Sequence, residues 1–259
     1  MNLTIYQIDA FADNLFEGNP AAVIPLQNWL DEQLMQKIAA ENNLSETAFF
    51  VPTETGFHIR WFTPEYEVNL CGHATLASSF VIFNCLDYKK KQIVFQSKSG
   101  ELFINLKDDK IEMDFPTMPP EHCDIPAGII EAFGRAPEEC LVNEDYIAVY
   151  DDEEFVRTVT PDFEKIKQLD QRAVMITAKS KEYDFVSRFF IPNHGIDEDP
   201  VTGSSFTKLT PYWAAVLEKN DFIAKQVSKR GGIVQCQLEA DRVKISGKAV
   251  LYMKGEIII

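Results

Sequence analysis

The sequence predicts an α/β (α+β) protein that consists of two similar domains, residues 1–115 and 116–259. Residues 116–126 contain four prolines and are typical of a linker between domains. On either side of this segment the predicted elements follow one order: strands, a helix, strands, a buried helix and strands. The second domain extends to the C-terminus, with the alternative that the last strand returns to the first domain. A chain of 259 residues is long enough to form two cores.

A short repeat supports the duplication. The pattern Arg-x-Phe-x-Pro begins at Arg60 in RWFTPEYEVNLC and again at Arg188 in RFFIPNHGIDED, 128 residues later. Equal spacing then leads to Cys71 in the first domain and to Asp199 in the second. In both domains this stretch ends in a turn of small residues, and an apolar helix follows. We therefore expect Cys71 and Asp199 to occupy equivalent positions.

The elements of the first domain follow from periodicity and turn residues. β-branched and aromatic runs predict strands, and Gly-Asn-Pro, Glu-Thr-Gly, Ser-Gly and Asp-Asp mark the turns between them. Residues 31–43 have helical spacing, with acidic residues at the front and Asn at the end. Residues 72–84 are small or apolar on every side, which is typical of a buried helix. The predicted strands are 3–12, one after Pro20, 45–52, 57–64 and three within 91–116.

The elements of the second domain are predicted in the same way. Helices are expected near 127–134 and 161–169, and an apolar helix is expected within 203–220 despite Pro211. The predicted strands are 144–152, 173–179, 185–192 and several within 231–259.

Composition limits the possible partners. The formal net charge is −15, and this negative field makes nucleic acid and anionic membrane surfaces poor partners. We find no apolar stretch of about 18–20 residues and no signal peptide, so a cytoplasmic location is expected. The five cysteines are odd in number, widely spaced and without a CxxC pair, and the four histidines are dispersed. This pattern predicts neither a disulfide framework nor a metal site.

Two helix starts are candidate binding elements. The N-terminus of a helix presents unpaired N–H groups and binds carboxylates. Such starts, after Cys71 and Asp199, would let an acidic protein hold an anionic small molecule. The alternative is that Asp199 only caps its helix.

His73 and Cys71 stand at the first of these starts. A helix N-terminus lowers the pKa of a nearby imidazole, so we expect a neutral His73 that exchanges protons, with a purely structural role as the alternative. The same field would favour a Cys71 thiolate. Because Asp199 stands where a second thiol would be needed, chemistry with two thiols is excluded, and Cys71 is interpreted as a small packing residue.

Glu46 is a further candidate. It lies in LSETAFF, before an otherwise apolar strand. If Ala48 and Phe50 face the core, strand alternation directs Glu46 to the same side. Burial would raise the pKa of this carboxyl toward the range that is useful for proton transfer. The alternative is that Glu46 lies in solvent at the end of the strand.

Five motifs in order, from residue 6 to the C-terminus, resemble one family: YQIDAFADNLFEGNPAAV, LSETAFF, RWFTPEYEVNLCGHATLA, RFFIPNHGIDEDPVTGSS and VKISGKAVLYMKGEI. They are similar to the PhzF-type phenazine-biosynthesis isomerases and their phenazine biosynthesis-like relatives. The resemblance implies the diaminopimelate epimerase fold. In that fold two similar domains each wrap a mostly antiparallel sheet around a central buried helix, and the active site lies between them.

The resemblance also implies roles for individual residues. Glu46 matches the general acid/base of the family, and His73 and Asp199 match residues that assist proton transfer and hold substrate. Further substrate-binding positions match Asn19, Gly72, Thr202, Gly203 and Ser204. The phenazine enzyme isomerises a dihydro-hydroxyanthranilate without a cofactor, so no cofactor and no metal are expected. Relatives further suggest a homodimer.

Two departures from the family pattern bear on the pocket. Ser205 and Phe206 replace a small residue and His after TGS, and QVSKRGG replaces a Gln-Gly segment near the end. The leading hypothesis is a cofactor-independent isomerase that moves a proton on a small carboxylate-bearing substrate. The alternatives are an epimerase or racemase of an amino-acid derivative and a non-catalytic binder of small molecules.

Overall fold

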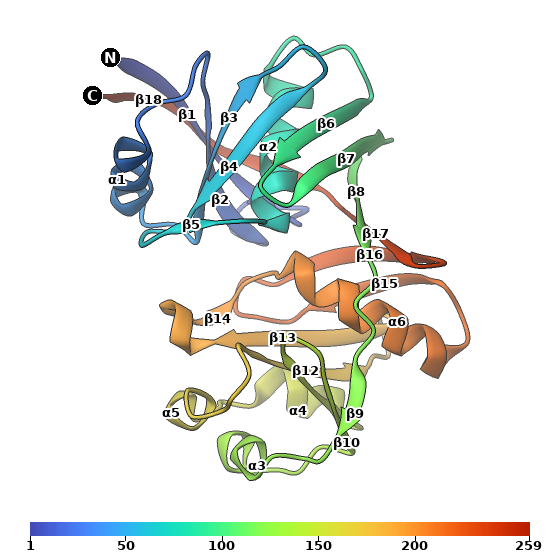
Figure 1. Ribbon diagram of the computed structural model, residues 1–259. Coiled ribbons are helices and arrows are strands. Elements are labelled where there is room, and N and C mark those ends of the chain that lie inside the picture. The colour runs from blue at the N-terminus through green and yellow to red at the C-terminus, as the bar shows by residue number, and fades with distance from the viewer. The chain divides into compact units, whose positions relative to one another are not determined.

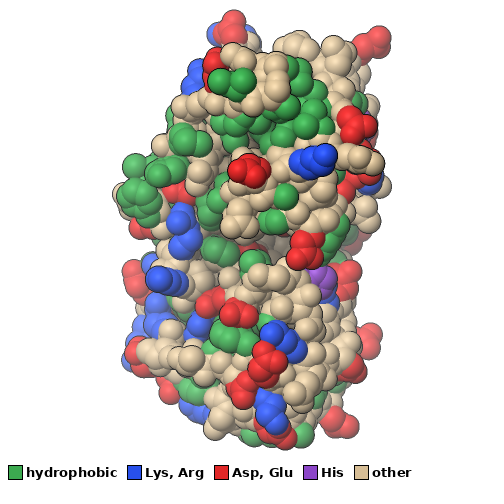
Figure 2. Space-filling model, turned by 90° about the vertical axis from the view of Figure 1, so that its left-hand side faces the viewer, with side chains coloured by type: hydrophobic (Ala, Val, Ile, Leu, Met, Phe, Trp, Pro, Cys, Tyr) green, Lys and Arg blue, Asp and Glu red, His purple; other side chains and the backbone are tan.

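The computed structural model describes residues 1–259 and divides them into two compact units (Figure 1). Unit 1 comprises Met1–Phe115 together with Ile245–Ile259, and unit 2 comprises Pro116–Lys244. No helix combines the length and the apolar composition that crossing a membrane requires. Acidic and basic side chains are interspersed on the face drawn in Figure 2.

Unit 1 is built on one mixed sheet. Strand β1 pairs antiparallel with both β18 and β2, so the C-terminal strand lies beside the N-terminal one. Next come a parallel pair (β2–β3), an antiparallel pair (β3–β4), a parallel pair (β4–β6) and two antiparallel pairs (β6–β7 and β7–β8). The strands are β1 (Asn2–Ala10), β2 (Asn19–Pro25), β3 (Glu46–Pro52), β4 (Phe57–Phe62), β5 (Glu67–Val68), β6 (Gln92–Ser97), β7 (Gly100–Lys107), β8 (Lys110–Pro116) and β18 (Ala249–Ile258).

Two helices belong to unit 1. Helix α1 (Glu32–Asn42) begins at the side-chain cap of Asp31 and ends at Asn43, whose backbone is left-handed. It packs on a core layer that includes Ile24 and Phe49. Helix α2 (Gly72–Cys85) packs against β1, β2 and β3 and is buried along most of its length, as its apolar composition predicts. Its hydroxyl groups donate to carbonyls one turn earlier, for example Ser78 to Ala74, so burial leaves them bonded.

Unit 2 repeats this pairing. An antiparallel pair (β10–β11) is followed by parallel β11–β12, antiparallel β12–β13, parallel β13–β15 and antiparallel β15–β16. Helices α3, α4 and α5 surround one core layer, and α6 packs against β16. The elements are β9 (Glu121–Cys123), α3 (Ala127–Phe133), β10 (Glu139–Val142), β11 (Tyr146–Tyr150), α4 (Glu153–Thr158), α5 (Phe163–Ile166), β12 (Val174–Lys179), β13 (Phe185–Ile191), β14 (Ile196–Asp199), α6 (Phe206–Leu217), β15 (Asp221–Gln226), β16 (Gly232–Glu239) and β17 (Arg242–Gly247), whose end lies in unit 1.

The repeated arginines have the same role in both units. Arg60 forms a bidentate pair with Glu67 on the adjacent strand and lies over the ring of Phe62. Arg188 forms a bidentate pair with Glu198 and lies over the ring of Phe190. The predicted α/β fold is thus confirmed, and the sequence repeat corresponds to a repeated contact.

Several local predictions were wrong. The proline-rich segment is not only a linker, because β9 forms within it and pairs with β10. The helix predicted over 161–169 is limited to Phe163–Ile166. Strands β10, β14 and β15 and helix α4 were not predicted, since each has six residues or fewer and too short a pattern to show a period.

Candidate active site

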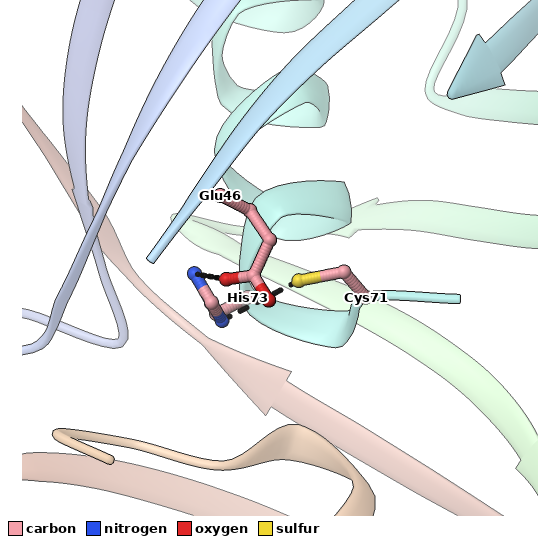
Figure 3. Close-up of side chains that lie close together, drawn as sticks. All are labelled: Glu46, Cys71 and His73. Carbon is pink, nitrogen blue, oxygen red and sulfur yellow. Dashed lines mark hydrogen bonds and ion pairs between the residues drawn. The ribbon is translucent and has the colours of Figure 1, made fainter. Parts of the chain in front are cut away.

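Glu46 is the first residue of β3, where the parallel neighbour β2 also begins. Every residue from Thr47 to Val51 is buried, so the strand is covered on both faces and burial shows no alternation. The Glu46 side chain keeps 17% of its surface exposed. Its Oε2 lies 3.1 Å from Nε2 of His73 on α2 (Figure 3). The carboxylate therefore points toward the helix and retains access to solvent.

His73 is the second residue of α2, and its ring is buried. Nδ1 lies 3.2 Å from Nδ2 of Asn19. It also lies 3.5 Å from Sγ of Cys71 (Figure 3). The Nε2 contact with Glu46 is an ion pair that lacks hydrogen-bond geometry, so neither atom has a hydrogen-bond partner.

The predicted lowering of the His73 pKa was wrong. Burial of the ring does lower its pKa, but Cys71 and the Glu46 carboxylate outweigh burial, and the pKa lies well above its ordinary value. A nearby carboxylate stabilises the imidazolium more than the helix N-terminus destabilises it. The raised pKa favours the protonated form of His73 beside Glu46.

Cys71 precedes α2 as its N-cap residue, and its side chain makes no capping hydrogen bond. Burial, together with the negative charge of Glu46, raises the pKa of the thiol to about 11. The expected thiolate does not form at neutral pH, because desolvation exceeds the effect of the helix N-terminus. This geometry agrees with a packing role.

We predict that Cys71→Ser retains most of the activity, within about tenfold of the parent. A neutral hydroxyl replaces a neutral thiol, and Ser is a good N-cap residue, so the melting temperature should hold or rise. Steady-state turnover and thermal unfolding measure both effects, with Cys236→Ser as a buried-thiol control. A loss of more than about a hundredfold in turnover, the scale of a proton-transfer group, would make Cys71 catalytic.

The other predicted residues of unit 1 lie beside this pair. Asn19 is the first residue of β2 and is fully buried, with its amide against His73. Gly72 is the first residue of α2. Unit 1 thus brings together Glu46, His73, Asn19 and Gly72.

The predicted residues of unit 2 form a second group. Asp199 ends β14, is 8% exposed, and accepts a 2.5 Å hydrogen bond from the hydroxyl of Thr202. Gly203 and Ser204 form a 3₁₀ turn with Ser205, and α6 begins only after this turn. Asp199 is therefore separated from its helix by a turn, whereas Cys71 adjoins α2 directly. The predicted equivalence of these two residues was wrong, because Asp199 pairs with Phe189 as Val68 pairs with Trp61.

Gln226 is a site residue that the sequence analysis missed. It is fully buried at the end of β15. Its Oε1 accepts from the Thr202 backbone N–H at 2.8 Å, and its Nε2 donates to the Asp199 carbonyl at 2.7 Å. It thereby holds both ends of the Asp199–Thr202 loop. Its position at the start of the unusual QVSKRGG segment was the available signal.

One potential metal-ligand cluster arises from folding. Ligand atoms of Glu46, Cys71 and His73 all lie within 4.8 Å of one another, although dispersed Cys and His residues predicted no such site. His73 contacts Glu46 through Nε2 and Cys71 through Nδ1.

Comparison with known proteins places this geometry in context. The model of the PhzC-PhzF family, described as phenazine biosynthesis-like protein, matches residues 8–255. An uncharacterized isomerase of Pseudomonas aeruginosa is 51% identical over 257 residues, with 99% of each chain covered. A PhzF-family crystal structure from Enterococcus faecalis is 45% identical, with 100% of each chain covered and a TM-score of 0.98. A hydroxyproline epimerase from Agrobacterium vitis is similar in fold alone: 9% identity, TM-score 0.64, with 99% and 92% of the two chains covered.

Proposed function

The chain belongs to the family of phenazine biosynthesis-like proteins, and from this premise we propose that it is a cofactor-independent isomerase that moves a proton on a small carboxylate-bearing substrate. The family and its relatives support an isomerase. The observation that carries the finer proposal is the 3.1 Å contact between Oε2 of the partly exposed Glu46 and Nε2 of the buried His73, whose pKa is raised.

Glu46 acts as the base. Its carboxylate takes a proton from an activated C–H bond, and the bonding electrons move into the adjoining unsaturated system of the substrate. The protonated carboxyl then returns the proton to another carbon, so atoms and charge balance without a cofactor. His73 lies beside this carboxylate, and its Nε2 offers a donor to the developing anion.

Asp199, Thr202, Gly203 and Ser204 bind and orient the substrate in this proposal. The support is local: two hydrogen bonds from Gln226 and one from Thr202 hold the loop in a single conformation. A preorganised loop loses little entropy when a ligand binds.

An epimerase or racemase is the second candidate, and the fold shared with a hydroxyproline epimerase favours it. Such an enzyme needs a base on each face of one carbon. The cysteine at the first helix is buried with a raised pKa, and Thr202, not a second cysteine, precedes the helical turn in unit 2. These features make the second candidate weaker than isomerisation.

Incubation in heavy water with a panel of unsaturated and aromatic carboxylic acids tests the proposal. We expect deuterium at a shifted position, detected by NMR and mass spectrometry. Deuterium with inversion at one carbon would identify an epimerase. Ligand binding without any exchange would identify a non-catalytic binder and contradict the proposal.

A further inference from the structure

Two cations in unit 2 share one buried carboxylate. Asp145 accepts hydrogen bonds from Nε and Nη2 of Arg172 at 2.8 and 2.9 Å, and its Oδ2 lies 2.9 Å from Nζ of Lys208. The side chains of Asp145 and Lys208 are fully buried. Lys208 also contacts Glu144 at 3.3 Å, so this group holds two positive and two negative side chains, and Arg172 carries one of the positive charges.

Arg172 presents that charge to solvent. Its side chain is 39% exposed, and Nη1 makes no hydrogen bond within the protein. The bidentate contact with Asp145 fixes the plane of the guanidinium, so Nη1 points in a set direction. A fixed, half-exposed guanidinium nitrogen is suited to binding a carboxylate.

Arg172 lies at the Asp199 end of unit 2. Its guanidinium lies over the ring of Phe189, 5.8 Å from the centroid. Phe189 is the register partner of Asp199 on the adjacent antiparallel strand, so both side chains are on one face of the sheet. Burial lowers the pKa of Arg172, but the hydrogen bonds and charge of Asp145 raise it, and the charges of Glu144 and Asp199 add to this increase.

The repeat gives Arg172 a defined counterpart. Thr47 pairs with Phe62 in unit 1, and Val174 pairs with Phe190, the repeat equivalent of Phe62, in unit 2. Glu46 therefore corresponds to Ala173, and Arg172 is the residue just before it. The position of the acid in unit 1 is thus an alanine in unit 2, with a cation next to it.

We propose that Arg172, oriented by Asp145 and Lys208, binds the carboxylate of the substrate beside Asp199. This inference rests on the proposed function and names the group that recognises its substrate class. Arg172 is a binding residue and takes no part in the proton transfer.

Calorimetric titration with benzoate and with its neutral analogue benzamide tests the inference. Arg172→Met should weaken benzoate binding by roughly 10–100-fold, the range for losing a charged hydrogen bond, and leave benzamide binding unchanged. Arg172→Lys keeps the charge without the fixed plane and should restore part of the affinity. The fold should survive in both variants, because Asp145 retains Lys208 as its partner.

Glu144→Gln is the matched control, since Glu144 contacts Lys208 at 3.3 Å but does not touch Arg172. It should change benzoate affinity less than about twofold. Failure of the wild-type protein to bind benzoate, or equal binding by Arg172→Met, would overturn the inference. These binding measurements need no turnover, so they are independent of the heavy-water test. If benzoate binding depended on Arg172 but no deuterium exchange occurred, this inference would stand and the proposed function would be wrong.

Discussion

Glu46→Gln should lower turnover by roughly 10²–10⁴-fold, the usual range for a general acid/base, with a much smaller loss of ligand affinity. The amide keeps the size of the side chain but cannot accept the proton. In the wild type the Glu46 side chain is 17% exposed, and its Oε2 lies 3.1 Å from Nε2 of His73. The substitution therefore removes one charge of a partly buried pair. Turnover, ligand titration and thermal unfolding measured together separate catalysis from stability.

The fold of Glu46→Gln should survive. An amide is less costly to desolvate than a carboxylate, and His73 can respond by losing its proton, because its pKa falls once the neighbouring negative charge is removed. Glu41→Gln, an exposed acid on α1, is the control and should behave as wild type. A markedly lower melting temperature with near-normal turnover would make Glu46 structural and move the proton-transfer role to His73 or Asp199.

His73→Gln should lower turnover by roughly a hundredfold. It should also abolish the decline of activity and of melting temperature at alkaline pH. The pKa of His73 in the folded protein is raised well above 6.5, its ordinary value. A group with a raised folded pKa contributes stability that is fully present below about pH 6.5 and is lost as the pH rises through the folded pKa. The melting temperature and the activity of the wild type should therefore both fall as the pH rises through the folded pKa of His73.

Profiles of kcat/KM and melting temperature against pH check this prediction. The alkaline decline should be absent from both profiles of His73→Gln. His122→Gln, in which an exposed histidine is replaced, should keep the wild-type profiles. If wild-type activity instead rose as the pH passed through 6 to 8, the neutral imidazole would be the working form, and the ion-pair mechanism would be wrong.

Local sequence alone determined those elements whose caps and hydrophobic pattern all lie within one segment of the chain. Asp31 and Asn43 bound an amphipathic run, and both caps are found where the sequence predicted them. Helix α2 is apolar on every side, and burial follows from that composition whatever the neighbours are. The repeat of Arg60 and Arg188 also showed in sequence, because each arginine bonds a glutamate a few residues away.

Tertiary structure alone decided the charge state and the partners of the site. The helix N-terminus predicted a lowered pKa for His73, but Glu46, far away in the sequence, lies 3.1 Å from its ring and reverses the sign. Asp145, Arg172 and Lys208 are likewise distant in sequence and meet only at the end of the unit 2 sheet. Coulomb energy depends on distance in space and on burial, and both arise only when the chain is folded. Sequence pattern could therefore indicate candidate residues but could not assign their protons.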